Sequence, residues 1–252
     1  MLLHEHLENG ADKNPNFPFS EFEGNSLSYQ EANLLSNQLA NKLVYEGLEV
    51  GDRFAFLAKN CTEMAIMYYA ASKVGAVPVP LNYRLADQEW AYIINDSEAK
   101  LIIVKGNEYS DRINQISSEL KNVKKYISIS LDNSIEKFQD FYDWLSDSSN
   151  EKPTLKIHEN DDVYQMYTSG TTGHPKGAVL LQRNVAANIR QYLNSLTLPR
   201  PSRTLLVAPM YHAAAMINMC GCIAIGGTIV IQEDFIPQDV VDCLANEKIT
   251  HT

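Results

Sequence analysis

The chain has 252 residues, of which 45% are hydrophobic, and a formal net charge of −10 at pH 7. This length predicts one large domain or two smaller ones with a substantial core. The acidic residues are scattered and the sequence shows no basic stripe. This argues against a nucleic-acid partner, because binding to phosphate backbones requires clustered lysine and arginine. The N-terminal sequence lacks the basic region and the long apolar region of a secretory signal.

Helices and strands are expected to alternate along the chain. Ser28 to Glu31 reads as a capping box at a helix start, apolar residues recur at helical spacing from Ala32 to Leu43, and Gly47 ends this helix. Further strands are expected over residues 53–58, 76–81, 101–104, 126–130, 163–168, 177–181, 204–208 and 228–231, and a last one opens at 249. Further helices are expected over residues 62–74, 86–95, 111–120, 135–145, 183–196, 213–224 and 237–246. Residues 146–160 are polar and are predicted to form a surface linker.

This alternation predicts an α/β fold with mostly parallel sheets. Pro78 and Pro80 lack the amide hydrogens of a sheet ladder, so residues 76–81 are not expected to form an ordinary central strand. Residues 204–232 contain no charged side chain and are long enough to span a bilayer. A proline, a glycine pair and a β-branched end favour a buried strand–helix–strand unit instead. We therefore expect no transmembrane segment, and peripheral contact with a membrane is left open.

The cysteine pattern bears on metals and on the cellular compartment. The chain has four cysteines, Cys61, Cys220, Cys222 and Cys243, and none of them has CxxC spacing. Cys220, Cys222 and His212 together suggest a metal site, but a fourth ligand and the usual zinc spacing are missing. We therefore expect buried free thiols, no metal ligand and a cytoplasmic location.

Residues 167–177, with the sequence YTSGTTGHPKG, are the strongest functional signal in the chain. Glycine lets backbone amides approach an anion closely, hydroxyls add donors, and Lys176 adds a positive charge. The candidate phosphate-binding residues are Thr168, Ser169, Gly170, Thr171, Thr172, Gly173 and Lys176. This is not a Walker loop, because Gly177 and Ala178 follow the lysine. On composition alone, a polar hairpin turn explains the residues about equally well.

Two further segments support a functional interpretation. Residues 207–215, VAPMYHAAA, place His212 just after a predicted strand, where parallel sheets bind ligands. His212 is a candidate hydrogen-bond donor, neutral or charged, and a structural histidine is the alternative. Residues 72–85, SKVGAVPVPLNYRL, contain a glycine that can end a helix, and their role is expected to be packing.

In their order and spacing, these three segments resemble motifs of the adenylate-forming, AMP-binding enzymes. The resemblance begins at about Leu27, and the NYRL and PMYH strings are most like acyl-CoA synthetases. It implies that the glycine-rich loop closes over the β- and γ-phosphates of ATP, and that His212 lies near the acyl carboxylate and the α-phosphate. Ala215 stands where many members of the family have glycine, which suggests a narrower cavity.

The resemblance also implies a fold of two stacked α/β lobes with mostly parallel sheets. The first lobe is expected over about 51–181, and the second over about 20–50 plus 182–252. The second lobe is expected to be truncated, and the C-terminal lid domain of the family to be absent. We therefore expect an N-terminal fragment or a truncated product.

The chemistry that the resemblance implies is ligation of a carboxylic acid to coenzyme A with ATP and Mg²⁺, with the Mg²⁺ ligand expected outside this chain. The acid reacts with ATP to give an acyl-adenylate and pyrophosphate, and a thiol then takes the acyl group. We expect the 252-residue chain to be inactive alone. Two alternatives stay open: a non-catalytic nucleotide-binding remnant, and another adenylate-forming enzyme such as an amino-acid-activating domain.

Overall fold

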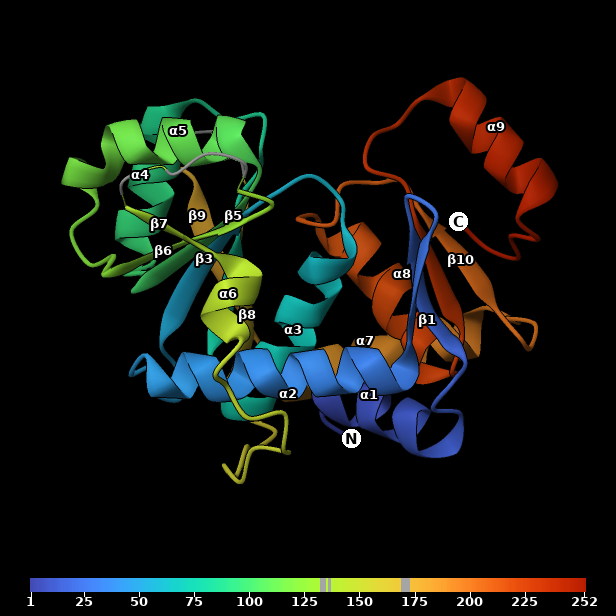
Figure 1. Ribbon diagram of the computed structural model, residues 1–252. Coiled ribbons are helices and arrows are strands. Elements are labelled where there is room, and N and C mark those ends of the chain that lie inside the picture. The colour runs from blue at the N-terminus through green and yellow to red at the C-terminus, as the bar shows by residue number, and fades with distance from the viewer. Residues whose placement is uncertain (132–134, 136, 169–172) are drawn as a thin grey trace.

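A computed structural model describes residues 1–131, 135, 137–168 and 173–252 (Figure 1). It is an α/β structure with two larger sheets and one two-stranded hairpin. A long helix, α2 (Tyr29–Tyr45), runs along one side of the molecule past both sheets.

The first larger sheet has five parallel strands in the order β4-β3-β5-β6-β7. These strands are β3 (Arg53–Leu57), β4 (Val77–Pro80), β5 (Leu101–Lys105), β6 (Lys125–Ile129) and β7 (Phe138–Asp140). Alternate residues of the strands face two apolar layers, as strand geometry requires. One layer contains α4 (Asp87–Asp96), α5 (Asn107–Ile116) and the short helix η1 (Ser117–Glu119), and the other contains α3 (Thr62–Val74) and α6 (Phe141–Leu145).

The second larger sheet has the order β10-β11-β1-β2. Its strands are β1 (Pro18–Phe22), β2 (Asn25–Ser28), β10 (Arg203–Leu206) and β11 (Thr228–Ile231). Strands β10, β11 and β1 are parallel, and β2 returns antiparallel to β1. Helix α8 (Ala213–Ala224) connects β10 to β11 and packs beside α7 (Gln182–Ser195) and α1 (Leu3–Lys13), whereas α9 (Pro237–Asn246) follows β11.

The hairpin consists of β8 (Asp162–Thr168) and β9 (Lys176–Leu181), which pair antiparallel. It packs beside β4 and against α3. Tyr164 of β8 meets Tyr68 of α3 edge to face, with ring centroids 6.0 Å apart.

Several sequence predictions are confirmed. The capping box is present: the Glu31 amide donates to Ser28 Oγ at 3.3 Å, and the Ser28 amide donates to a Glu31 carboxylate oxygen at 2.8 Å. Strand β4, with its two prolines, lies at the edge of its sheet. Residues 204–232 form the strand–helix–strand unit β10-α8-β11, and none of the helices described could cross a membrane.

Other predictions are wrong. The sequence reading missed α1, β1 and β2. Of the described residues in the helix expected over 135–145, only Phe141–Leu145 are helical. Residues 138–140 pair with β6 as strand β7, and Asp140 caps the helix by accepting from the amides of Tyr142 and Asp143. Helix α5 begins four residues earlier than expected and ends at Ile116.

Candidate functional site

The carboxyl ends of the two larger sheets meet at residues 59–60, directly after β3. The Asn60 amide nitrogen donates to the carbonyl of Ala208, which follows β10, at 3.0 Å, and to that of Gln232, which follows β11, at 3.1 Å. The Lys59 ammonium lies 2.6 Å from a carboxylate oxygen of Asp234. Because parallel sheets bind ligands beyond the carboxyl ends of their strands, this junction is the place to look for a site.

His212 lies beyond the carboxyl end of β10 and is the N-cap of α8. Its amide donates to the Pro209 carbonyl at 2.9 Å, and its Nδ1 accepts from the Ala214 amide at 3.3 Å. Since Nδ1 accepts, the neutral ring carries its proton on Nε2. The side chain is exposed, so this N–H is available to a ligand. Ala215, by contrast, is 1% exposed, and its methyl group packs in the core.

The described part of the glycine-rich segment is the stem of the hairpin. Thr168 at the end of β8 lies directly opposite Lys176 at the start of β9, and both side chains are exposed. A Cβ at Gly177 would come within 2.3 Å of the side-chain amide nitrogen of Gln165, so a larger residue here would have to displace that side chain. Gly173 is also described and exposed, whereas four of the predicted phosphate-binding residues lie outside the described residues: Ser169, Gly170, Thr171 and Thr172.

Helix α4 holds both sides of this stem. The Tyr167 hydroxyl donates to a carboxylate oxygen of Asp96 at 2.6 Å, and burial together with this carboxylate raises the pKa of Tyr167. The His174 ring stacks on Tyr92 with centroids 4.5 Å apart and an interplanar angle of 18°. The stem is therefore anchored on the side of the first sheet.

Helix α3 connects the stem to the turn that carries His212. Tyr68 contacts Tyr164 of the hairpin through its ring, and its hydroxyl donates to the Met210 carbonyl at 3.2 Å. Tyr83 meets Tyr211 edge to face at 5.6 Å, so the NYRL segment lies beside the PMYH segment. The structure thus brings together the three segments that the sequence singled out. The sequence reading missed Asn60 and Tyr68, although a polar residue just after an apolar strand was a usable signal.

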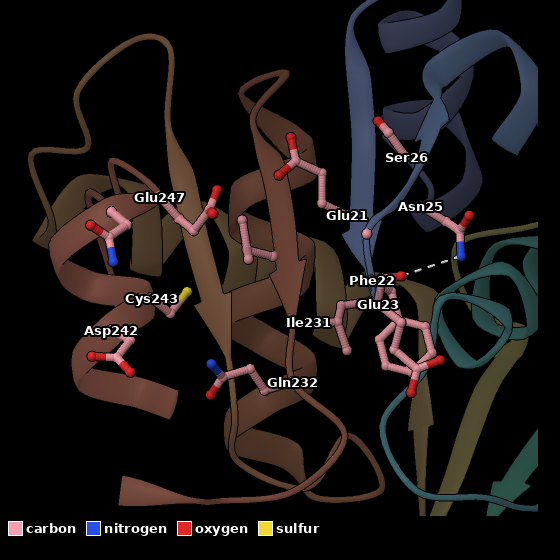
Figure 2. A pocket seen from close by; sticks show the side chains of 13 residues that line it. Glu21, Phe22, Glu23, Asn25, Ser26, Ile231, Gln232, Asp242, Cys243 and Glu247 are labelled. Atoms are coloured by element: carbon pink, nitrogen blue, oxygen red, sulfur yellow. Dashed lines mark hydrogen bonds between the residues drawn. The ribbon is translucent and has the colours of Figure 1, made fainter. Parts of the chain in front are cut away.

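A hollow in the second larger sheet's side of the molecule lies apart from the hairpin stem and His212. It measures about 430 Å³ and is formed between the β1–β2 turn, β11 and α9 (Figure 2). Acidic side chains line much of it, among them Glu21, Glu23, Asp242 and Glu247. None of the predicted site residues that the structure describes lines this hollow, so we do not assign the reaction to it.

The described residues contain no group of three His, Cys, Asp or Glu side chains that is arranged to hold a metal ion. All four cysteines are free and buried, as predicted. Cys220 and Cys222 lie within α8, where the Cys220 thiol contacts the Met216 sulfur at 3.2 Å and the Cys222 thiol donates to the Thr228 carbonyl at 3.4 Å.

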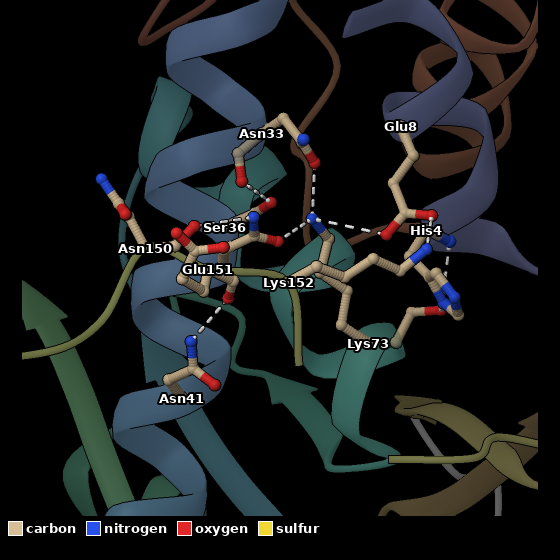
Figure 3. Close-up of polar contacts among 11 residues, drawn as sticks. His4, Glu8, Asn33, Ser36, Asn41, Lys73, Asn150, Glu151 and Lys152 are labelled. Atoms are coloured by element: carbon tan, nitrogen blue, oxygen red, sulfur yellow. Dashed lines mark hydrogen bonds and ion pairs between the residues drawn. The ribbon is translucent and has the colours of Figure 1, made fainter. Parts of the chain in front are cut away.

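One polar cluster lies among the helices around Lys73 (Figure 3). Lys73 of α3 is 2% exposed, and its ammonium donates to the side-chain oxygens of Asn33 at 2.6 Å and Asn37 at 2.5 Å. It also lies 3.9 Å from a carboxylate oxygen of Glu8 in α1. Burial lowers the pKa of Lys73 to about 8. The cluster joins α1, α2 and α3.

Two mostly parallel sheets that meet at their carboxyl ends, with a Thr/Gly/Lys hairpin beside them, define an α/β protein of the adenylate-forming type. The chain belongs to the AMP-binding enzyme family, whose family model matches residues 7–252. The match begins earlier than the predicted start near Leu27, because α1 and β1, which the sequence reading missed, belong to the fold.

The curated relatives that match include ligases that form acyl-CoA. The chain is 30% identical over 225 residues to the long-chain-fatty-acid–CoA ligase FadD13 of Mycobacterium tuberculosis, and 30% identical over 228 residues to a feruloyl-CoA synthase of Amycolatopsis. The alignments cover 88% and 90% of the chain but 43% of each relative. The chain thus spans less than half the length of these relatives.

Solved structures of related ligases have the same fold as this chain. A putative long-chain-fatty-acid CoA ligase from Rhodopseudomonas palustris superposes with a TM-score of 0.90 at 26% identity, over 99% of this chain and 62% of that one. The N-terminal domain of FACL13 from Mycobacterium tuberculosis gives a TM-score of 0.88 at 27% identity, over 98% of this chain and 61% of that one.

Proposed function

We propose that the chain is the N-terminal part of an ATP-dependent acyl-CoA synthetase. The observation that carries the proposal is the stem of the hairpin, where the hydroxyl of Thr168 and the ammonium of Lys176 face solvent from directly opposed positions. A hydroxyl donor beside a cation suits a polyphosphate, and the family match makes ATP the ligand to test. We further propose that the lobes divide at about residues 51–181 and 20–50 plus 182–252, that the second lobe is incomplete, and that the lid domain lies outside this chain.

In this proposal the chain's own residues bind ATP and orient the carboxylic acid beside it. ATP supplies the leaving group, because joining a carboxylate to AMP releases pyrophosphate and leaves a reactive mixed anhydride. Lys176, Thr168 and the neighbouring candidates Ser169 to Gly173 restrain the pyrophosphate portion. His212 presents its Nε2 N–H to the acyl carboxylate near the α-phosphate. Transfer of this kind depends on positioning and on charge stabilisation.

Two further reactants follow from the family. The first is Mg²⁺, whose ligand the family resemblance implies to lie outside this chain, so we assign no residue of this chain to that ion. Coenzyme A is the proposed thiol acceptor. The acid is proposed to be a fatty or aromatic carboxylic acid, because relatives are named for long-chain fatty acids and for ferulate. We place the reaction in the cytoplasm.

The test is carboxylate-dependent exchange of labelled pyrophosphate into ATP by the intact enzyme, with a panel of fatty, aromatic and amino acids. We expect exchange with fatty or aromatic acids and none with the 252-residue chain alone. Exchange with amino acids only would make the protein an amino-acid-activating enzyme. The absence of exchange with every acid would favour a non-catalytic remnant.

A pair of variants separates the two roles of His212. His212→Ala removes both the cap of α8 and the proposed donor, and should slow adenylate formation by about 10²-fold if the donor is central. His212→Asn keeps a capping oxygen, because asparagine is among the best N-cap residues. We expect His212→Asn to restore the thermal stability but not the rate. Exchange within about twofold of the parent in both variants would remove His212 from the site.

A further inference from the structure

Asn60 is a buried polar side chain at the junction of the two larger sheets. It is 2% exposed. Its amide nitrogen donates to the carbonyls of Ala208 and Gln232 at 3.0 and 3.1 Å, and its amide oxygen accepts from the Met210 amide at 2.7 Å. One side chain therefore holds the ends of β10 and β11 and the turn that follows β10.

The contacts of this position suit a primary amide. The Ala208 and Gln232 carbonyls lie past the last paired residues of their strands, where the ladder no longer supplies donors. A primary amide offers two N–H donors and one acceptor oxygen, so Asn60 satisfies two carbonyls and one amide at once.

The contact with Met210 reaches His212. The Met210 peptide groups are held on both sides, because Asn60 accepts from the amide and the Tyr68 hydroxyl donates to the carbonyl at 3.2 Å. The neighbouring Pro209 carbonyl accepts from the His212 amide at 2.9 Å. A shift of this turn therefore moves the backbone from which the His212 ring projects.

Asn60 also belongs to the side of the molecule that holds the hairpin. It follows β3, whose first residue, Arg53, donates to the Gln165 side chain of β8 at 3.2 Å. The residue that fixes the His212 turn is thus attached to the same sheet as the residue that fixes the stem. Arg53 begins this strand, and Asn60 lies three residues beyond its last residue, Leu57.

We propose that Asn60 is a positioning residue. Through the Met210 turn, it sets the position of the His212 ring relative to the paired residues Thr168 and Lys176 of the stem. Asn60 itself is buried and reaches the reaction only through His212. The proposal has two halves. The functional half, that Asn60 affects the reaction rate, rests on the adenylation function proposed above. The structural half, that Asn60 holds the His212 turn in place, does not depend on that function.

The structural half is tested on the 252-residue chain by NMR of the His212 ring and of the Ala214 amide that it caps. Asn60→Ala should move or broaden both signals, which are assigned by their loss or shift in His212→Asn. The matched control is Asn37→Ala, since Asn37 is a 4% exposed asparagine whose amide nitrogen donates to the Asn150 carbonyl at 2.9 Å. The control should leave both signals in place. Unchanged signals in folded Asn60→Ala would overturn the proposal.

Asn60→Asp provides the test if the alanine variant does not fold. It keeps the acceptor for the Met210 amide but turns a carboxylate oxygen toward the carbonyls of Ala208 and Gln232. We expect the His212 signals to be displaced at neutral pH and to return toward the parent when acid protonates the new carboxyl group. Signals that match the parent at every pH would overturn the proposal.

The functional half is tested in the intact enzyme by pyrophosphate exchange at saturating ATP and acid. A misplacement of about 1 Å can cost about 10²-fold in rate, so Asn60→Ala should lose between about tenfold and 10²-fold, and Asn37→Ala less than about twofold. Displaced signals with an unchanged rate would overturn the positioning role. An inactive parent enzyme would refute the adenylation function instead, and the NMR result would still decide what Asn60 holds.

Discussion

The buried ammonium of Lys73 predicts an unusual dependence of stability on pH. Burial lowers the pKa of Lys73 from 10.5 to about 8, whereas in the unfolded chain the side chain is solvated. Between these pH values the unfolded state binds more protons at this site than the folded state does. The contribution of Lys73 to the free energy of unfolding therefore rises as the pH increases from about 8 to 10.5. As the pH falls from 10.5 through 8, the protein loses this stability again.

The expected size follows from about 1.36 kcal/mol for each pH unit, or about 3 kcal/mol across the window. The variant Lys73→Met lacks this titration. The free energy of unfolding of the parent, minus that of the variant, should therefore increase by about 3 kcal/mol from pH 7.5 to about 10.5. Taking the difference cancels the tyrosines and cysteines that titrate in the same range.

Urea denaturation followed by the fluorescence of the buried Trp90 and Trp144 measures both free energies. Ser36→Ala is the control, because it removes the hydrogen bond from the Ser36 hydroxyl to the Asn33 carbonyl in the same cluster but no titratable group. Its difference from the parent should stay constant with pH. A constant difference for Lys73→Met as well would show that folding does not disfavour the ammonium, and would refute the reasoning.

Three further changes have defined outcomes. Burial lowers the pKa of His6 from 6.5 to about 4, so the parent should lose about 3 kcal/mol of stability as the pH falls through this window. His6→Gln should lack that loss in urea titrations, and equal losses in both proteins would contradict the shift. Lys176→Ala should slow adenylation in the intact enzyme by at least about tenfold, and because Lys176 is exposed the variant should change the free energy of unfolding by less than about 0.5 kcal/mol; a large fall in melting temperature with normal adenylation would mean a structural lysine. Gly10→Ala places a Cβ 2.3 Å from the Tyr29 ring, which is fully buried and donates to the Gly227 carbonyl at 2.7 Å. It should destabilise the protein by about 1–3 kcal/mol in calorimetry, and an unchanged melting temperature would show that this contact is not tight.

Elements with strong local signals could be predicted from the sequence. Helices α3, α8 and α9 begin and end at the predicted residues. Glycine follows α3 directly and α8 after one residue, proline begins α9, and apolar runs fill the interiors of α3 and α8. Helix α1 was missed because few of its residues are apolar and it depends on burying Leu3 and Leu7. Strand β7 was missed because the neighbouring β6, rather than its own pattern, makes it a strand.

In the candidate site, too, residues with a local sequence signal could be predicted and residues defined by distant partners could not. The glycine-rich segment and His212 were evident because their residue types are unusual in that order. Asn60 follows an apolar strand, which was a usable signal, but its partners could not be predicted, because they lie 148, 150 and 172 residues further along the chain. Only the folded arrangement of the two sheets shows what its amide contacts.

The pairing of β1 with β11 has a consequence for the order of folding. Ser20 lies beside Ile229, so forming this ladder closes a loop that contains most of the chain. Such a loop carries a large closure entropy, and ladders of this kind form slowly. During synthesis the five-stranded sheet, contained in residues 53–140, has all its strands long before β11 emerges. The edge of β1 that pairs with β11 therefore stays unpaired while the ribosome adds about 200 residues. During that interval the apolar side chains of β1 are exposed to other chains.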